Sequence, residues 1–181
     1  MKELSLYILD LVQNSLKAQA KCISISVNDS VSKDLLEITI GDDGIGMDSE
    51  LLSRVTEPFT TTRTTREFGL GIPFFQMAAK SAGGTFHIES SPGQGTKLTG
   101  TFIRSHVDTP PLGDMAETFV TLVHGAPDVD FTYFCENDSQ RFTFDTREIR
   151  EALEDVPLDT PDVLDWIRNH LRELILSIEN N

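Results

Sequence analysis

The sequence predicts an α/β (α+β) fold, because segments with helical periodicity stand beside segments with strand periodicity. Apolar residues recur every three or four positions in residues 3–20, as on one face of a helix. Apolar and polar residues then alternate in residues 23–27 and 36–40, as in half-buried strands. A chain of 181 residues with 39% hydrophobic content suits one domain, or one domain with a small annex.

The helix expected over residues 3–20 has one apolar and one polar side, at about 100° per residue. The apolar side carries Leu4, Ile8, Leu11, Val12 and Ser15. The polar side carries Asp10, Asn14, Lys17 and Lys21. One side is therefore suited to a core, and the other presents a carboxylate, an amide and ammonium groups in a row.

The two alternating segments predict an antiparallel hairpin with a polar turn around residues 28–34. Its second strand delivers Asp42 and Asp43 at its end, directly before the glycine pair of residues 44–46. Asp48 then fits the N-cap of a short helix that runs to about Val55.

Residues 60–66 predict a mobile loop, because they are polar, β-branched and basic without an apolar period. A second helix is expected from about Gly71 to Ala82, ended by a glycine doublet. Its inward residues are predicted to be Phe74, Phe75, Met77 and Ala78. Residues 85–89 and 97–103 predict two more strands, joined by a turn through Gly93-Gln94-Gly95.

Pro110-Pro111 marks a boundary, so the sequence predicts one domain over residues 1–106 and an acidic α+β region over residues 107–181. This second region is expected to contain a helix at 113–124, a hairpin of 131–135 with 141–144, and a helix after the capping-box spacing of Asp145 and Glu148. It is a candidate surface for a partner or a dimer.

A last helix is expected from Pro161 to about Ile178, after an N-cap at Thr160. Its apolar residues repeat at spacings of three and four: Leu164, Ile167, Leu171, Leu174 and Ile178. The repeat fits a homodimer seam or packing within the chain, and its short length favours packing within the chain.

The net charge of -14 argues against nucleic acid as the main partner. Residues 1–104 carry 12 acids and 10 bases, whereas residues 105–181 carry 17 acids and 5 bases. The sequence shows neither a signal peptide nor a membrane span, and Cys22 and Cys135 are interpreted as buried, reduced thiols, so a cytoplasmic location is expected.

Three Gly-x-Gly pairs, at residues 44–46, 69–71 and 93–95, together predict a nucleotide pocket. The Asp42 carboxylate, at a strand end, is suited to accept a hydrogen bond from the exocyclic amine of adenine. Gly44 and Gly46 would let a flat base approach the backbone. Gly69 and Gly71 open a helix whose first amides favour phosphate, and the preceding loop supplies Arg63 and Arg66.

The first helix supplies the groups that a metal–phosphate end requires. Asn14 can offer its amide oxygen to Mg²⁺, and Lys17, one turn on, can reach a terminal phosphate. Asp10, one turn before, can orient or deprotonate a water. The chain contains no Walker A motif, and Phe74 stands where a Rossmann fingerprint needs its third glycine.

Five segments in this order resemble the N, G1, F, G2 and G3 boxes of the GHKL ATPases, the family of histidine kinases, gyrase B, MutL and heat-shock chaperones. The segments are Asp10–Asn14, Asp42–Met47, Glu57–Arg63, Gly69-Leu70-Gly71 and Gly95-Thr96-Lys97. The resemblance covers about residues 3–104. It implies the Bergerat fold, a two-layer α/β sandwich with a mixed sheet, and Mg·ATP bound under a mobile lid.

The resemblance also implies site roles: Asn14 as the Mg²⁺ ligand, Asp42 as the adenine reader and Thr96 as a polar contact near the base. The full expected nucleotide set is Asn14, Asp42, Gly44, Gly46, Met47, Thr62, Arg63, Arg66, Gly69, Leu70, Gly71 and Thr96. Asp10 matches the place of the catalytic acid in the hydrolysing branches, which usually carry glutamate there.

The expected function is an ATP-hydrolysing conformational switch that signals to a protein partner. One alternative is a kinase acting in trans on a partner's serine or histidine, since residues 57–63 and the Asn14-to-Lys17 spacing are similar to histidine kinases. A non-catalytic nucleotide sensor is the third reading. Self-phosphorylation is not expected, because no dimerising hairpin precedes the ATP domain and no histidine sits in a His-Glu or His-Asp helix context.

Overall fold

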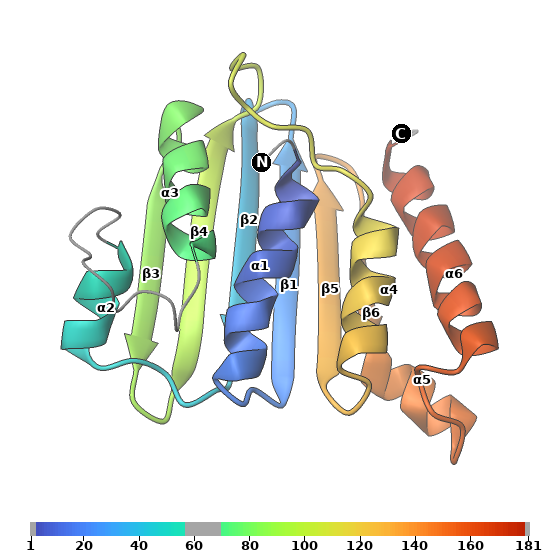
Figure 1. Cartoon of the computed structure of the whole chain (residues 1–181). Helices are drawn as coiled ribbons and strands as arrows, with labels where there is room; N and C mark the ends of the chain where they lie inside the picture. The colour runs from blue at the N-terminus through green and yellow to red at the C-terminus, as the bar shows by residue number, and fades with distance from the viewer. Residues whose placement is uncertain (1–2, 57–69, 180–181) are drawn as a thin grey trace.

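A computed structural model describes residues 3–56 and 70–179 of the chain (Figure 1). In these residues the strands form one six-stranded mixed sheet, in the order β3-β4-β2-β1-β5-β6. The elements are α1 (Leu4–Lys17), β1 (Cys22–Ser30), β2 (Leu35–Asp42), α2 (Ser49–Thr56), α3 (Gly71–Ser81), β3 (Phe86–Ser91), β4 (Gly95–Ile103), α4 (Met115–Gly125), β5 (Asp130–Asn137), β6 (Arg141–Asp145), α5 (Thr146–Leu153) and α6 (Pro161–Glu179). None of the helices in the described residues is long and apolar enough to cross a bilayer.

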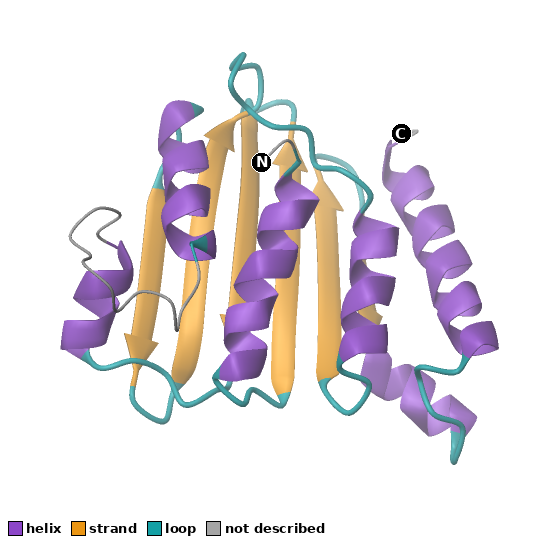
Figure 2. Cartoon of the chain, in the orientation of Figure 1, coloured by secondary structure: helices purple, strands orange, loops and turns teal. Residues whose placement is uncertain are grey.

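Helices α1, α3 and α4 lie side by side over one face of the sheet, so the predicted two-layer α/β arrangement is confirmed (Figure 2). The alternation of apolar and polar residues in the strands makes one face of the sheet apolar, and the helices cover that face. Residues such as Ile23, Ile25, Ile38 and Ile40 are buried beneath the helices, and the residues between them are polar and partly or fully exposed. The core therefore lies between the sheet and the helical layer.

The N-terminal hairpin forms as its alternating sequence predicts. Strand β1 pairs antiparallel with β2 over the register Ile23↔Asp42 to Ser30↔Leu35, and β2 pairs antiparallel with β4. Residues 28–30, expected in the turn, belong to β1. Helix α2 begins after Asp48, whose carboxylate accepts a 2.8 Å hydrogen bond from the Leu51 amide, so the predicted N-cap is confirmed.

The C-terminal region continues the same sheet. Strand β5 pairs parallel with β1 over the register Cys22↔Asp130 to Asp29↔Asn137, and β6 pairs antiparallel with β5. Helix α4 packs on α1, and α6 packs on α4, β5 and β6. The expected hairpin and helices of this region are present. The division at residue 106 remains a prediction, and the sheet is continuous across it.

Helix α3 begins and ends as predicted, but its inward face is different. Phe74 and Met77 are each 42% exposed, whereas Phe75 is fully buried. The buried residues are Gly71, Ile72, Phe75 and Ala79, at helical spacings. Apolar residues occupy most of the circumference of this helix, and Gln76 and Lys80 mark its polar side, so apolarity alone selected the wrong pair.

The two cysteines differ in burial. Cys135, on β5, is buried as expected, whereas Cys22 is exposed, so its prediction was wrong. Cys22 is the first residue of β1 and lies, by alternation, on the same uncovered face as Ser24. Both thiols are free.

Helix α6 packs within the chain, which the sequence favoured over a dimer seam. Ile167, Leu171 and Ile178 are buried, and Leu164 and Leu174 are partly buried against the core. The expected capping box before α5 forms in part: the Asp145 carboxylate accepts from the Arg147 amide at 2.9 Å.

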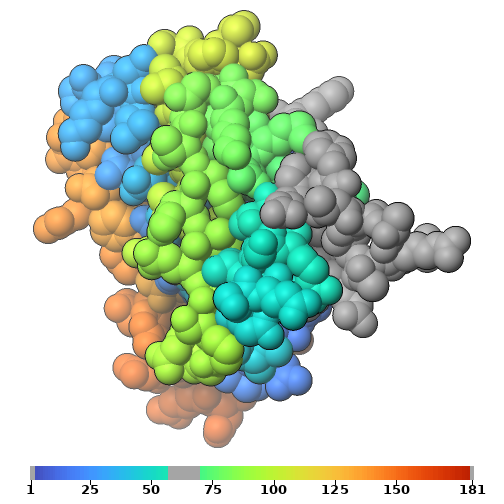
Figure 3. All heavy atoms as spheres, turned by 90° about the vertical axis from the view of Figure 1, so that its left-hand side faces the viewer, coloured from blue at the N-terminus to red at the C-terminus, as the bar shows by residue number. Residues whose placement is uncertain are grey.

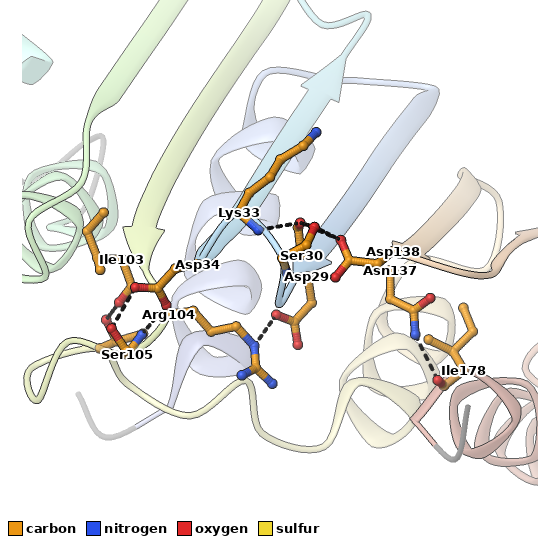
Figure 4. A network of polar contacts seen from close by, with 12 residues as sticks. Asp29, Ser30, Lys33, Asp34, Ile103, Arg104, Ser105, Asn137, Asp138 and Ile178 are labelled. Carbon is orange, nitrogen blue, oxygen red and sulfur yellow. Dashed lines mark hydrogen bonds and ion pairs between the residues drawn. The ribbon is translucent and has the colours of Figure 1, made fainter.

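A polar network ties the β1–β2 turn to the C-terminal region (Figure 4). Asp138 accepts hydrogen bonds from Ser30 Oγ, from the Ser32 amide at 2.8 Å and from Ser32 Oγ at 2.9 Å. Next to it, Asn137 Nδ2 donates to the Ile178 carbonyl at 2.8 Å. The hydrogen bonds to the Asp138 carboxylate lower its pKa from 3.8 to about 2.

Candidate functional site

A cavity of about 310 Å³ lies between α1 and the sheet, at the end where β2 finishes and β4 begins. Its walls are largely apolar and include Leu11, Ile40, Met47, Ile72 and Leu98. Asn14, Lys17, Asp42 and Thr96 supply its polar groups. A mostly apolar cavity with a few convergent polar groups is typical of a small-molecule site.

Three hydrogen bonds hold the Asp42 carboxylate in place. Ser15 Oγ on α1 donates to its Oδ2 at 2.6 Å, and its Oδ1 accepts from the Gly44 amide at 2.9 Å and the Thr96 amide at 3.3 Å. Asp42 shares the parity of the buried Ile38 and Ile40, so strand alternation directs it to the helix-covered side. The carboxylate is thus fixed at the cavity wall.

The neighbouring Asp43 carboxylate binds backbone amides at the start of β1. Its Oδ1 accepts from the Lys21 amide at 2.7 Å and the Cys22 amide at 2.9 Å. The backbone hydrogen bond from Cys22 is the main cause of a lowered Asp43 pKa. The acidic doublet therefore splits into one cavity residue, Asp42, and one residue that anchors the start of β1.

Asn14 brings a buried donor to the cavity. Its Nδ2 atom is buried and has no hydrogen-bond partner among the described residues. Such a group is rare in folded proteins and costs about 1–3 kcal/mol when it is left unpaired. Lys17, one turn on, is exposed and also lines the cavity.

Two backbone segments cross so closely at the rim of the cavity that only glycine fits. Gly95 has φ +77°, and a Cβ there would lie 1.9 Å from the Asp42 carbonyl oxygen. Gly46 has φ +68°, and its Cβ would lie 2.0 Å from the Ser91 carbonyl oxygen. These glycines let the loop after β2 cross the β3–β4 turn.

Ser90 joins the same two segments through its hydroxyl. Its Oγ accepts from the Met47 amide at 2.8 Å and lies 2.9 Å from both the Gly95 carbonyl oxygen and Thr96 Oγ1. The position of Thr96 at the cavity therefore depends on Ser90.

Helix α3 starts beside Asp10. A Cβ on Gly71 would lie 3.1 Å from the Asp10 Cβ, so these two backbones are in close contact. No side chain caps the helix at Leu70, and Pro73 has no amide hydrogen to offer. Within the residues that the structure describes, no acceptor is recorded for the amides of Gly71 and Ile72.

The structure brings together about half of the expected site. Six expected residues line the cavity: Asn14, Lys17, Asp42, Gly46, Met47 and Thr96. Gly44 is buried against Ala18, Asp10 and Gly71 meet beside the cavity, and Leu70 is exposed. Thr62, Arg63, Arg66, Gly69 and the loop of residues 60–66 lie outside the described residues.

Sequence reasoning missed two residues that organise the site. Ser15 was assigned to the core face, and the structure shows it buried with its hydroxyl on Asp42. Ser90 carried no expectation at all. The signal available for Ser15 was a polar residue, directly after Asn14, on an otherwise apolar helix face. The sequence contains no comparable signal for Ser90.

A larger hollow of about 570 Å³ lies on the uncovered face of the sheet and also touches Asp42 and Thr96. Its other walls are polar strand residues such as Ser24, Thr39 and Thr132. Most of its lining side chains are polar or charged, whereas those of the smaller cavity are mostly apolar, so the smaller cavity is better suited to a flat aromatic ring.

The described residues suit Mg²⁺ only as part of a nucleotide complex. They contain no cluster of three or more His, Cys, Asp or Glu side chains that could hold an ion by themselves. Mg²⁺ commonly takes one or two protein oxygens, together with phosphate oxygens and waters. The side-chain oxygen of Asn14, which lines the cavity, is of the type that this mode needs. Its amide nitrogen, unpaired among the described residues, is suited to donate to a ligand oxygen.

Comparisons with known proteins show what the chain is similar to. A putative sensor protein of Shewanella frigidimarina is 35% identical over 99 residues, which cover 54% of this chain and 15% of the relative. The sensor protein kinase FleS of Pseudomonas aeruginosa is 34% identical over 92 residues, which cover 51% of this chain and 23% of the relative. The chain spans less than a quarter of the length of these relatives.

The Aquifex aeolicus MutL ATPase domain complexed with ADP shares the fold, with a TM-score of 0.53 and 16% identity over 78% of this chain and 64% of that chain. The model of the family described as "Histidine kinase-, DNA gyrase B-, and HSP90-like ATPase" matches residues 2–106. That match covers more than half of the 181 residues. The chain therefore belongs to the histidine kinase-, DNA gyrase B- and HSP90-like ATPase family.

Proposed function

We propose that this chain is a regulatory protein that binds Mg·ATP in the cavity beneath α1 and hydrolyses it as a conformational switch for a protein partner. The buried Asn14 nitrogen, which has no hydrogen-bond partner in residues 3–56 and 70–179, carries this proposal. A fold rarely leaves such a group unpaired unless a ligand completes the site. Family membership is the second support.

The base end of the proposed site is preorganised. The Asp42 carboxylate accepts a hydrogen bond from the exocyclic amine of adenine, and Ser15 and two backbone amides hold the carboxylate in place. The apolar side chains of Leu11, Ile40 and Leu98 enclose the ring. Asp42 therefore selects for adenine, because guanine offers no amine at this edge.

The phosphate end lies toward α3. The Asn14 oxygen would hold Mg²⁺, and the Lys17 ammonium group would bind the terminal phosphate. The Gly71 and Ile72 amides, for which the described residues provide no recorded acceptor, would favour an anion at the start of α3. Mg²⁺, when bound, neutralises phosphate charge during the reaction.

Asp10 is the proposed general base. It is exposed and lies beside the start of α3, within the same end of the molecule as Asn14. Its carboxylate takes a proton from a water, the water oxygen bonds to the γ-phosphorus, and ADP leaves with the electrons of the broken P–O bond. Aspartate is one methylene shorter than glutamate, so slow turnover is expected.

Phosphate release from γ-labelled ATP tests this proposal. The purified chain should release labelled phosphate, and Asp10→Asn should lose release while it keeps ATP binding. If the wild-type chain binds ATP but releases no labelled phosphate, hydrolysis is refuted and a non-catalytic nucleotide sensor is supported instead. Absence of ATP binding would overturn the proposal as a whole.

A kinase acting in trans is the second candidate, and the relative that is named a sensor protein kinase favours it. In that case Asp10 accepts the hydroxyl proton of a partner's serine, and the γ-phosphoryl group moves to the serine oxygen. The same labelled ATP distinguishes the two. Label on a co-purified protein supports the kinase, and free phosphate supports the switch.

A further inference from the structure

A second hollow lies on the C-terminal side of the molecule, between α5, α6 and the edge strand β6. Its volume is about 460 Å³. Its walls are mainly apolar: Phe144, Ile149, Ala152, Leu153, Val163 and Trp166. It shares no lining residue with the cavity beneath α1. Figure 1 shows α5 and α6 at the opposite end of the sheet from α2. We call this hollow the α5–α6 groove.

Trp166 forms one wall of the groove and remains 51% exposed. It stacks on His170, with ring centroids 4.8 Å apart and an interplanar angle of 16°. Trp166 is the only tryptophan of the chain. Stacking holds the indole in one orientation, and exposed, fixed tryptophans are enriched among the residues that dominate protein–protein binding.

The rim of the groove is negatively charged. Glu148 and Asp162 line it, and neither forms an ion pair with any described residue. Residues 145–165 contain eight acids and two arginines. Both arginines are already paired, Arg147 with Asp145 and Arg150 with Asp130. The remaining carboxylates therefore set the potential at the groove.

This charge decides what kind of molecule fits. Nucleic acid and anionic lipid surfaces are repelled. A second copy of the chain, with its net charge of -14, is also disfavoured. A segment that carries lysine or arginine gains from the rim, and its apolar side chain gains from the walls.

We propose that the α5–α6 groove binds a basic segment of a protein partner, with one bulky apolar side chain against Trp166 and cationic side chains beside Glu148 and Asp162. The wall from Val163 to His170 is about 10 Å long at 1.5 Å per residue. The groove thus takes one or two anchor side chains rather than a long helix. It is a site separate from the proposed nucleotide site and stands on its own observations.

The test uses the full chain and two synthetic peptides of one design, each with two leucines in the middle and four lysines or four glutamates around them. Trp166 reports directly on the groove, because its fluorescence is the only tryptophan signal. The lysine peptide should shift the emission to shorter wavelength with saturation, and bind at least about 10-fold more tightly than the glutamate peptide.

Two variants locate the site. Glu148→Lys with Asp162→Lys should weaken lysine-peptide binding about 10-fold or more. The matched control carries the same two charge reversals outside the groove, Glu37→Lys with Asp108→Lys, and should bind almost as the wild type does. Ala152→Phe fills the groove from an exposed position, so it should block binding without removing a core side chain.

Several outcomes would overturn the proposal. One is equal weakening in both charge-reversal variants, which would mean attraction to net charge alone. Equal binding of the two peptides, unaltered binding by Ala152→Phe, or concentration-dependent dimers that bury Trp166 would do the same. The lysine peptide should still bind to Asn14→Ala. Failure of the proposed nucleotide site can therefore be distinguished from failure of the proposed peptide site.

Discussion

Asn14 is the residue on which the proposed nucleotide site most depends. Its amide nitrogen is buried with no partner in the part of the chain that the structure describes, and its neighbour Ser15 donates a hydrogen bond to Asp42. Consecutive residues of one helix thus provide the proposed metal ligand and the support of the proposed adenine-binding carboxylate. Any shift of α1 along the sheet would disturb both ends of the site together.

Asn14→Ala should weaken Mg·ATP binding roughly 100-fold or more, because the metal loses its protein oxygen. The free energy of unfolding should not fall, because the amide nitrogen has no hydrogen-bond partner to lose among the described residues, and removing an unpaired buried donor relieves its desolvation penalty. Calorimetric titration and urea unfolding measure the two effects. The control is Gln13→Ala, which changes the exposed residue directly before Asn14. Unchanged Mg·ATP affinity would refute the metal role.

Asp42→Asn should weaken ATP binding about 10- to 100-fold, since a charged acceptor facing the adenine amine is lost. Asparagine keeps an oxygen for the Gly44 and Thr96 amides, so the fold should survive. Purine riboside triphosphate, which lacks the amine, should bind wild type and variant with nearly equal affinity. The adenine role is wrong if the variant weakens both nucleotides to the same extent.

The sequence predicts that three polar side chains share one site, and the structure brings them to one cavity, while their chemical roles remain predictions. Asn14, Lys17 and Asp42 follow from helix and strand spacing, and all three line the cavity. Ser15 and Ser90 act through hydrogen bonds to residues 27 and 6 positions away, and such partners cannot be read from local pattern.

At the scale of elements, the turn between β3 and β4 contains a natural pair for comparison. Gly93 and Gly95 both have positive φ, at +73° and +77°. A Cβ on Gly93 meets nothing within 4 Å, whereas one on Gly95 would lie 1.9 Å from the Asp42 carbonyl oxygen. Only the second substitution forces two backbones apart.

Gly93→Ala should therefore cost about 1–2 kcal/mol, from left-handed strain alone. Gly95→Ala should destabilise by more than about 3 kcal/mol and also weaken ATP binding, because Asp42 moves. Urea unfolding of the two variants gives the comparison. Equal destabilisation would mean that the crossing at Asp42 contributes nothing.

The turns of the two hairpins are joined by Asp138, which predicts a pH dependence. Its pKa is lowered from 3.8 to about 2 in the folded chain, chiefly by the hydrogen bond from Ser30 Oγ. A lowered folded pKa adds stability that is complete above the unfolded value and is lost as the pH falls toward 2. The stabilisation of the folded chain by the Asp138 carboxylate is thus present at neutral pH and declines between about pH 4 and pH 2.

Asp138→Asn should lower the melting temperature at pH 7, and the gap from wild type should narrow once the pH falls below about 4. Thermal melts at steps from pH 7 to pH 3 measure the gap. Glu136→Gln removes a nearby carboxylate that lies outside this network and should show no such narrowing. A constant gap across the range would contradict the role of Asp138.

Helix α3 shows where element-level prediction stops. Its length and ends follow from Gly71 and the glycine doublet after it, and both are confirmed. Its inward face is set by packing against α1 and β4, where Phe75 meets Phe102 with ring centroids 5.6 Å apart. Because apolar residues cover most of the circumference of α3, several faces satisfy the apolar pattern, and the pattern alone does not choose between them.

At the scale of the whole molecule, β1 is a central strand only because β5 covers its second edge. Helix α4 in turn packs beside α1. Residues 1–106 alone would leave β1 with an unpaired edge and one side of α1 bare. Exposed edges of this kind promote self-association.

The isolated segment 1–106 should therefore self-associate or unfold, while the full chain should unfold in one cooperative transition. Size-exclusion chromatography and calorimetry check both expectations. A monomeric 1–106 with a melting temperature close to that of the full chain would instead support two independent domains.

The parallel pairing of β1 with β5 could not be predicted from the sequence. Both strands are recognisable by their alternation, and their partners in the hairpins follow from short turns. The β1–β5 contact, however, joins residues about 100 positions apart, from Cys22↔Asp130 onward, and depends on how α4 crosses the sheet. Local pattern contains no signal for that choice.

The most direct test of the proposed nucleotide site is a crystal structure of the full chain with Mg²⁺ and a non-hydrolysable ATP analogue. The adenine amine should lie within hydrogen-bond distance of the Asp42 carboxylate, between Leu11 and Leu98. The metal should be bound to Asn14 Oδ1 and to phosphate oxygens. An analogue bound elsewhere, or a cavity that stays closed by its own side chains at saturating ligand, would contradict the central claim.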